Sequence, residues 1–357
     1  MVDLESNRQY MIRARQVINA TGVWTDDTQT LANERGQFHV RSSKGIHLVV
    51  PRDRIRSSSG IILRTDKSVL FVIPWGRHWI IGTTDTDWSL DKAHPAASQR
   101  DIRYLLDQVN SVLRVPLTEA DVEGVFAGLR PLLAGESADT SALSREHAVA
   151  HSVPGLVVIA GGKYTTYRVM ARTRSTRPST AWVRPSTAKS PSASPTTYHC
   201  SEPKASGRWN ARTQLAAESG LNESRIARLL NRYGSMIGEV LALIRDDPSL
   251  GVPLPAADDY LRAEVVYGTT HEGALHLDDV LCRRTRISIE TFDRGTESCS
   301  EVADLMAPVL GWSDEQKARE VAHYLARVAA ERESQSMPDD ETADGARLGA
   351  ADIVPVG

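Results

Sequence analysis

Val158-Ile-Ala-Gly-Gly-Lys-Tyr-Thr-Thr-Tyr-Arg168 carries the strongest fold signal in this chain, a buried strand that runs through a glycine pair into the start of a helix. Glycines let a ligand approach the backbone, and the free N–H groups at a helix N-terminus favour an anionic or electron-rich group. Lys163 adds a mobile cation at that point. The same spacing also suits a plain strand-to-helix turn, so the pattern alone leaves both interpretations open.

Two further segments have the same character. A strand ends in small residues at Val17-Ile-Asn-Ala-Thr-Gly-Val-Trp-Thr25. Small side chains there would let a nucleotide lie against the chain, although such a run of small residues more often forms a tight turn. Gly82-Thr-Thr-Asp85 follows an apolar strand and suits either a turn or a second wall of a cleft.

The first 170 residues alternate strand-like and helical patterns. Apolar residues at helical spacing predict an amphipathic helix over residues 98–114. This mixture predicts an α/β or α+β domain. The predicted strands are Gln16–Ala20, Ile46–Val50, Ser68–Ile73, His78–Gly82 and Leu156–Ala160.

Residues 172–201 differ in composition, because Arg, Ser, Thr and Pro dominate and neither Asp nor Glu occurs. Such a stretch cannot bury a core, so residues 171–210 are expected to be disordered, as a natural interdomain linker would be. A local frameshift is the alternative that we favour. One extra base near codon 171 turns Ala171 to Pro178 into Ala-Lys-Asp-Ala-Val-Asp-Ala-Ala, a strong helix former that would continue the helix begun at Thr165.

From Leu215 onward the apolar periodicity is helical. Ser313 with Gln316 forms a capping box that opens a long helix through Val328. We expect a small all-α domain over residues 211–340. After Ser334 the chain is acidic and contains proline, which predicts a loose tail that includes residues 341–357.

Composition narrows the class of protein. The 357 residues allow about two domains at roughly 150 residues each. The net charge of −3 gives no global basic field, which argues against a nucleic-acid partner. Cys200, Cys282 and Cys299 lack the spacing of a zinc site or a disulfide framework, so no metal is expected and a reducing cytoplasm is the simplest location. No uncharged apolar run approaches the roughly 20 residues of a membrane helix, so membrane contact is expected to be peripheral.

Two arginines and a histidine are candidates for chemistry. Arg130 ends the apolar run Val122–Leu129, where a guanidinium would be aimed out of a sheet edge. Arginine recognises phosphate through two parallel hydrogen bonds and keeps its charge. For Arg130 or Arg145 alone, a surface ion pair is the more common role. A lone histidine before a buried strand, as His47 is, is more often structural than catalytic.

Taken together, six segments resemble, in order and spacing, the FAD-dependent, quinone-linked glycerol-3-phosphate dehydrogenases, especially the actinobacterial members. Residues 272–286 resemble the helical cap of the same family. The resemblance covers residues 1 to about 170 and 215 to about 340, and it is specific because an unrelated flavoprotein would share only one or two of these blocks. The six segments are Ala20-Thr-Gly-Val-Trp, Lys44-Gly-Ile-His-Leu-Val-Val-Pro51, Phe71-Val-Ile-Pro-Trp-Gly, Ile80-Ile-Gly-Thr-Thr-Asp85, Gly128-Leu-Arg-Pro-Leu132 and Gly161-Gly-Lys-Tyr-Thr-Thr-Tyr-Arg168.

The resemblance implies an α/β fold, namely part of a glutathione-reductase-like FAD fold with a mixed-sheet substrate region, plus a C-terminal all-α domain. The implied reaction is hydride transfer from C2 of sn-glycerol 3-phosphate to flavin N5, which gives dihydroxyacetone phosphate and passes electrons to a membrane quinone. Enzymes of this family are commonly peripheral membrane proteins, which here means the inner face of the plasma membrane, and they are often homodimers.

The resemblance also assigns a cofactor site by matched position. Gly161, Gly162, Lys163, Tyr164 and Thr165 are expected to face the flavin ring. Ala20, Thr21 and Gly22 are expected to lie against the nucleotide part of FAD.

The substrate site follows in the same way. Arg130 would lie over the flavin near the substrate hydroxyl, where a cation favours the developing alkoxide. Arg145 would take the phosphate, and Lys163, Thr165 and His47 would complete the pocket. Arg130, Lys163 and His47 are the catalytic candidates of this set.

The chain also departs from the family. The opening strand and helix with Gly-x-Gly-x-x-Gly for the FAD pyrophosphate are absent, as are active-site His and Arg residues near them. We therefore expect an N-terminally truncated member that is inactive alone. Two alternatives stay open. One is a catalytically dead remnant of such an enzyme. The other is a related FAD-dependent amine or amino-acid oxidase, but the two arginines matched to phosphate binding argue against it.

Overall fold

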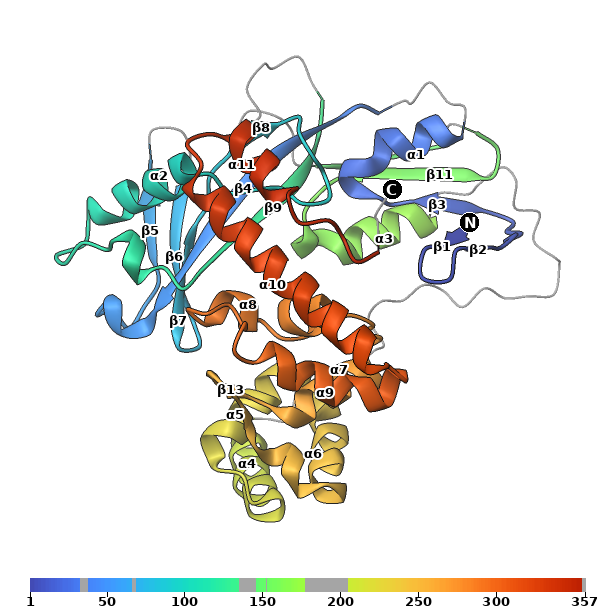
Figure 1. Cartoon of the computed structure of the whole chain (residues 1–357). Helices are drawn as coiled ribbons and strands as arrows, with labels where there is room; N and C mark the ends of the chain where they lie inside the picture. The colour runs from blue at the N-terminus through green and yellow to red at the C-terminus, as the bar shows by residue number, and fades with distance from the viewer. Residues whose placement is uncertain (33–37, 66–68, 135–145, 152, 177–204, 355–357) are drawn as a thin grey trace.

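The computed structural model describes residues 1–32, 38–65, 69–134, 146–151, 153–176 and 205–354. Two sheets form the upper body of the molecule, and a helical C-terminal domain lies below them (Figure 1). A small hairpin of β1 (Val2–Asp3) and β2 (Arg8–Gln9) precedes both sheets. Among the described residues, no helix is both long and apolar enough to cross a membrane.

The smaller sheet has three strands in the order β10-β11-β3. The central strand β11 is antiparallel to β10 and parallel to β3. Because β11 and β3 are parallel, the residues that follow them leave the same edge of the sheet. The elements are β10 (His147–Ala150), β11 (Leu156–Gly161), β3 (Val17–Asn19), the short helix η1 (Gly22–Trp24), α1 (Thr25–Leu31), η5 (Tyr164–Thr166) and α3 (Tyr167–Thr176).

The larger sheet has six strands and is antiparallel. Its long central strand β4 pairs with β7 and β8 on one side and with β9 on the other. All five strands predicted from sequence are present, with bounds shifted by a few residues, or by more for β4. The strands are β4 (Val40–Pro51), β5 (Ile61–Arg64), β6 (Val69–Trp75), β7 (His78–Gly82), β8 (Thr86–Trp88) and β9 (Gly124–Leu133).

Strand β4 presents different side chains on its two faces, as the period of two requires. Ile46, Leu48 and Val50 are buried in the main core of this part of the chain. Helix α2 (Gln99–Asn110) covers that face with its own apolar stripe and begins at a capping box formed by Ser98 and Asp101. The opposite face carries Ser43, Gly45 and His47, the residues of interest for function.

The C-terminal domain is helical, with two packed cores. The expectation of an all-α domain was wrong in one detail, because β12 (Pro253–Leu254) and β13 (Ala257–Leu261) form a hairpin. Its tight turn includes Ala256 at a φ of 51°. The helices are α4 (Ala205–Ser219), α5 (Glu223–Tyr233), α6 (Ile237–Asp246), α7 (Arg262–Thr270), the π-helix η8 (Asp279–Arg284), α8 (Ile287–Glu290), α9 (Cys299–Leu310) and α10 (Asp314–Ser336).

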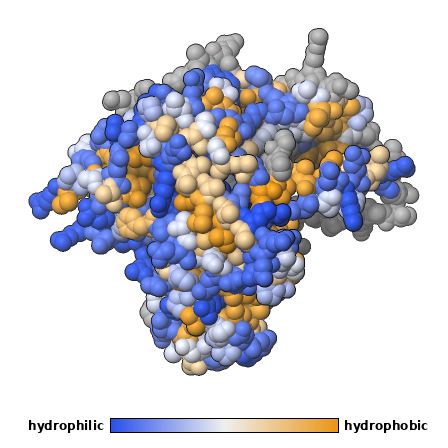
Figure 2. Space-filling view, in the orientation of Figure 1, coloured by the Kyte–Doolittle hydropathy of each residue, from blue (hydrophilic) through white to orange (hydrophobic). Residues whose placement is uncertain are grey.

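The end of the chain returns to the larger sheet. Helix α10 crosses from the C-terminal domain to the sheets, and α11 (Asp340–Arg347) follows it (Figure 1). Hydrophobic side chains gather along the middle of this face, over α10 (Figure 2). The expectation of a loose tail after Ser334 was therefore wrong for residues up to Arg347, because α11 buries Ala343 and Arg347.

The predicted linker lies mostly outside the described residues. Helix α3 continues to Thr176 and α4 begins at Ala205, so residues 171–176 and 205–210 are helical where disorder was expected. Residues 177–204 are not described, and the choice between a natural linker and a frameshift stays a prediction.

Candidate active site

Arg130 lies within strand β9, directly opposite Ser43 of β4. Its guanidinium crosses the sheet face: Nη2 donates to the Thr83 hydroxyl at 3.0 Å, and Nη1 donates to the Thr84 carbonyl at 3.3 Å. Asp85 lies 3.9 Å from Nη1, and its side chain is 7% exposed. The sequence-based expectation of a side chain aimed out of a sheet edge was wrong, because the guanidinium lies over the sheet face against Thr83 and Thr84.

Gly45 makes room for this guanidinium. A Cβ atom on Gly45 would lie 2.4 Å from Nη2 of Arg130 and 2.6 Å from the Thr83 hydroxyl oxygen. Contacts that short do not occur between real atoms, so any side chain here would move the arginine. By contrast, a Cβ atom on Gly128, which pairs with Gly45, would meet nothing within 4 Å. The face over Gly128 is therefore open space beside Arg130.

His47 lies two residues further along β4 on the same face. Its ring stacks on Phe126 with centroids 4.8 Å apart, and a Cβ atom on Gly82 would lie 2.3 Å from the ring. Burial, helped by the positive charge of Arg130, lowers the pKa of His47 to about 4. Its Nδ1 is buried and has no hydrogen-bond partner among the described residues. At neutral pH the imidazole is therefore neutral.

The flavin-facing residues assigned by resemblance lie at one edge of the smaller sheet. Val158 pairs with Asn19 in the parallel ladder, so the chain leaves β11 and β3 side by side. Residues 163–169, which follow β11, are all exposed, and Ala20 and Thr21, which follow β3, are exposed as well. Carboxyl ends of adjacent parallel strands are the usual place for a nucleotide in such sheets. These residues fit one side of a flavin nucleotide.

The glycine pair has a second role that the sequence did not reveal. A Cβ atom on Gly161 would lie 2.6 Å from the Glu146 carbonyl oxygen, and one on Gly162 would lie 2.7 Å from the Met170 sulfur. Both glycines also have positive φ, at 72° and 85°. They are therefore required by their own neighbours in the fold, whether or not a ligand lies against them.

Strand β9 connects the two sheets. Its Pro131 ring lies 3.9 Å from the Cβ position of Gly22, and its Leu133 side chain lies 3.2 Å from that of Gly161. Arg130 thus lies on the same strand as Pro131 and Leu133, which pack against the edge expected to face the flavin. Within the described residues, no hydrogen bond or ion pair joins Lys163 or Thr165 to Arg130 or His47, and Arg145 lies outside the described residues.

Sequence reasoning left open the residues that hold Arg130. Thr83, Thr84 and Asp85 come from the segment that suited a turn or the wall of a cleft. They connect β7 to β8 and contact the Arg130 guanidinium. Phe126, which stacks on His47, was missed because it lies in an apolar run with no distinguishing pattern.

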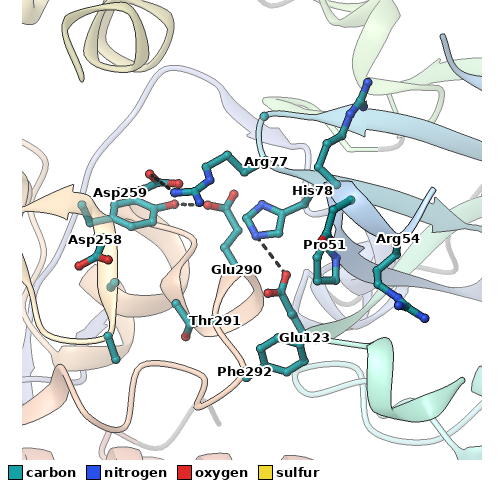
Figure 3. Close-up of a pocket in the computed structure, with 16 residues that line it drawn as sticks. Pro51, Arg54, Arg77, His78, Glu123, Asp258, Asp259, Glu290, Thr291 and Phe292 are labelled. Atoms are coloured by element: carbon teal, nitrogen blue, oxygen red, sulfur yellow. Dashed lines mark hydrogen bonds and ion pairs between the residues drawn. The ribbon is translucent and has the colours of Figure 1, made fainter. Parts of the chain in front are cut away.

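A separate cavity lies away from this site. It has a volume of about 800 Å³ and lies between the larger sheet and the C-terminal domain (Figure 3). His78 and Glu123 point toward each other in it, 3.1 Å apart, and although burial opposes the charge, Glu123 raises the pKa of His78. Neither Arg130 nor His47 lines this cavity.

Two protein families match the chain. Residues 2–168 match the FAD dependent oxidoreductase family, and residues 202–317 match the C-terminal domain of alpha-glycerophosphate oxidase. The fold and these matches define part of a flavin-dependent oxidoreductase with a helical C-terminal domain.

Comparison with similar proteins shows to which family of flavin-dependent oxidoreductases the chain belongs. The chain is 54% identical to glycerol-3-phosphate dehydrogenase 2 of Mycobacterium bovis and 55% identical to the glycerol-3-phosphate dehydrogenase of Mycobacterium leprae, in each case over 98% of this chain and 59% of the relative. The glycerol-3-phosphate dehydrogenase of Bacillus halodurans, solved with FAD, matches with a TM-score of 0.70 and 26% identity, over 92% of this chain and 64% of that one. The chain belongs to the FAD-dependent glycerol-3-phosphate dehydrogenase family and spans about three-fifths of the length of these mycobacterial relatives.

Proposed function

We propose that this chain provides the substrate-binding face and one wall of the flavin site in an enzyme that oxidises sn-glycerol 3-phosphate to dihydroxyacetone phosphate. The observation that carries the proposal is the guanidinium of Arg130, held across Gly45 beside a neutral His47. A fixed cation on an open sheet face stabilises the negative oxygen that develops when a secondary alcohol is oxidised.

Each of the two side chains has a separate task. The Arg130 guanidinium stabilises the negative charge that develops on the substrate oxygen as its proton leaves. His47 completes the pocket as a neutral ring packed on Phe126, and the proton leaves to solvent. The low pKa of His47 keeps the ring unprotonated before the reaction begins. FAD, when bound, supplies the acceptor for the hydride from C2.

The cofactor and phosphate assignments complete the proposal. Gly161, Gly162, Lys163, Tyr164 and Thr165 hold the flavin ring. Ala20, Thr21 and Gly22 hold the nucleotide part, which the parallel register of β3 and β11 supports.

The remaining substrate and partner roles rest on family resemblance. Arg145 binds the substrate phosphate, with Lys163 and Thr165 beside it. Electrons pass on to a membrane quinone, from a homodimer that contacts the inner face of the plasma membrane peripherally.

We also propose that the described residues do not retain FAD by themselves. Cofactor sites bury about 70–90% of their ligand. The flavin-facing residues here are exposed, Tyr164 to 89%, and Val17 and Ile18 of the adjacent strand are 56% and 50% exposed. One open wall of this kind gives weak binding and no turnover.

A hybrid enzyme provides the test. This chain would replace the matching 59% of the Mycobacterium leprae relative, and dye reduction would be measured with glycerol 3-phosphate, glycerol and glycine as substrates. We expect activity with glycerol 3-phosphate and a loss of about 10²-fold or more in kcat for Arg130→Gln, since one fixed donor to an oxyanion contributes that much. The matched control is Arg41→Gln, which removes a pair of β4 with Asp87.

Other outcomes would count against the proposal. A hybrid that oxidises glycine and not glycerol 3-phosphate would support the amine or amino-acid oxidase. A hybrid that folds, binds FAD and oxidises none of these substrates would support the catalytically dead remnant.

A further inference from the structure

A second pocket lies between the turn of the β6–β7 hairpin and the C-terminal domain. Its volume is about 640 Å³, and it adjoins the cavity of Figure 3, with which it shares Arg77, Asp259 and Glu290. It lies apart from the candidate active site, because neither Arg130 nor His47 lines it. Seven arginines do line it: Arg77, Arg225, Arg228, Arg232, Arg283, Arg284 and Arg286.

Four of these arginines have carboxylate partners. Arg77 pairs with Asp259 at 3.2 Å, a contact drawn in Figure 3, and Arg283 pairs with Asp279 at 3.1 Å. Arg228 and Arg232 share the fully buried carboxylate of Glu264, at 2.9 and 3.5 Å. These pairs balance part of the positive charge.

The other three arginines are Arg225, Arg284 and Arg286. Within the described residues, none of them has a carboxylate within 4.0 Å. Arg284 donates to the Glu272 carbonyl, and Arg286 lies over the Trp75 ring, 4.4 Å from its centroid. Nη1 of Arg225 is buried without a hydrogen-bond partner in the part of the chain that the structure describes.

Two carboxylates of the lining remain, Glu272 and Glu290, and among the described residues neither lies within 4.0 Å of an arginine nitrogen. Glu290 accepts hydrogen bonds from the Trp75 indole N–H at 3.1 Å and from the Tyr260 hydroxyl at 2.8 Å. It therefore joins the sheet to the C-terminal domain instead of neutralising the three arginines. The pocket keeps an excess of positive charge, and a buried guanidinium N–H without an acceptor is costly.

We propose that this pocket binds a phosphate group, as free phosphate or a phosphate monoester. A planar guanidinium offers paired N–H donors that match phosphate oxygens, and a dianion supplies the acceptors that Arg225, Arg284 and Arg286 lack. The site is built from α5, the last residue of η8 and Arg286 beyond it, with Trp75 on the sheet side. A bound phosphate would therefore hold the C-terminal domain against the larger sheet. This inference is independent of the proposed function.

Titration of the purified full chain with inorganic phosphate, followed by calorimetry at constant ionic strength, tests the proposal. We expect saturable binding, and an affinity at least about tenfold weaker in Arg225→Gln/Arg286→Gln, since hydrogen bonds to charged groups are the strong ones. The control is Arg319→Gln, an exposed arginine of α10 outside this pocket, which should bind phosphate as the unchanged chain does. Circular dichroism would establish that each variant is folded.

Vesicles separate the two sources of a phosphate group. Phosphatidic acid, whose headgroup is a phosphate monoester, and phosphatidylcholine vesicles would be used in co-sedimentation with the same variants. If only phosphatidic acid vesicles bind, and the double variant abolishes that binding, the phosphate belongs to a lipid headgroup. The proposal is overturned if neither probe binds, or if the folded double variant binds phosphate and vesicles as well as the unchanged chain.

Discussion

At the scale of single residues, the candidate site depends on two glycines, because their lack of a side chain leaves space for neighbouring side chains. Gly45 leaves space for the Arg130 guanidinium, and Gly82 leaves space for the His47 ring. Neither glycine has a positive φ, so the requirement is for space and not for backbone conformation. The position of each of these two side chains therefore depends on a neighbouring glycine, which has no side chain.

Gly45→Ala tests this arrangement in the hybrid enzyme. The added methyl would displace the guanidinium, and we expect kcat/KM for glycerol 3-phosphate to fall about 10- to 100-fold, since a misplacement of about 1 Å costs up to 10²-fold. Gly128→Ala is the matched control on the same face, where a Cβ atom meets nothing within 4 Å. Equal activity of the two variants would show that Arg130 tolerates displacement.

The pKa of His47 predicts a dependence of stability on pH. Its folded-state pKa is about 4, below the ordinary 6.5, so the unfolded chain binds the proton more readily. Stability should therefore decline as pH falls from about 6.5 toward about 4. His47→Gln should flatten this decline in thermal melts of the chain, while His151→Gln, at an exposed histidine, should not. Parallel curves for the unchanged chain and His47→Gln would contradict the assignment.

At the scale of elements, β4 serves two purposes with its two faces. One face carries Gly45 and His47, and the other carries Lys44, which is fully buried. Lys44 Nζ lies 2.6 Å from Asp101 of α2 and 2.7 Å from Asp340 of α11. The buried lysine therefore joins the C-terminal helix to the sheet that carries the candidate site.

Lys44→Met should destabilise the chain strongly. Removing one member of a buried ionic cluster leaves the others uncompensated and costs about 3–5 kcal/mol. The comparison is Lys92→Met, which removes a partly exposed pair with Asp27 and should cost about 0–1 kcal/mol. Urea unfolding of both variants measures the difference, and similar midpoints would mean that the Lys44 cluster contributes little.

At the scale of the whole molecule, β9 joins the two sheets and α8 joins the C-terminal domain to them. A Cβ atom on Gly124, at the start of β9, would lie 2.4 Å from the Ile289 carbonyl oxygen of α8. The C-terminal domain thus packs directly on one end of the sheet face, while Arg130 lies near the other end of the same strand. The flavin-facing edge remains open.

This open edge predicts how FAD behaves. The purified chain, mixed with FAD and passed through gel filtration, should emerge with a substoichiometric flavin band, because its flavin-facing residues form a single exposed wall. The hybrid with the Mycobacterium leprae relative should retain near-stoichiometric flavin. A near-stoichiometric band on the chain alone would refute the proposal that the described residues do not retain FAD.

The sequence by itself determined five of the strands, most of the helix expected over residues 98–114, which is Gln99–Asn110 in the structure, and the glycine turn after β11, because these depend on local backbone preferences and apolar periodicity. The family could also be recognised from its motifs. Only the tertiary structure decided which residues contact each other. It places the Arg130 guanidinium over Gly45, pairs Lys44 with Asp340 at a separation of 296 residues, and gathers arginines of several elements around one pocket. Strand register and domain packing are set by contacts between residues far apart in the chain, which no local pattern encodes.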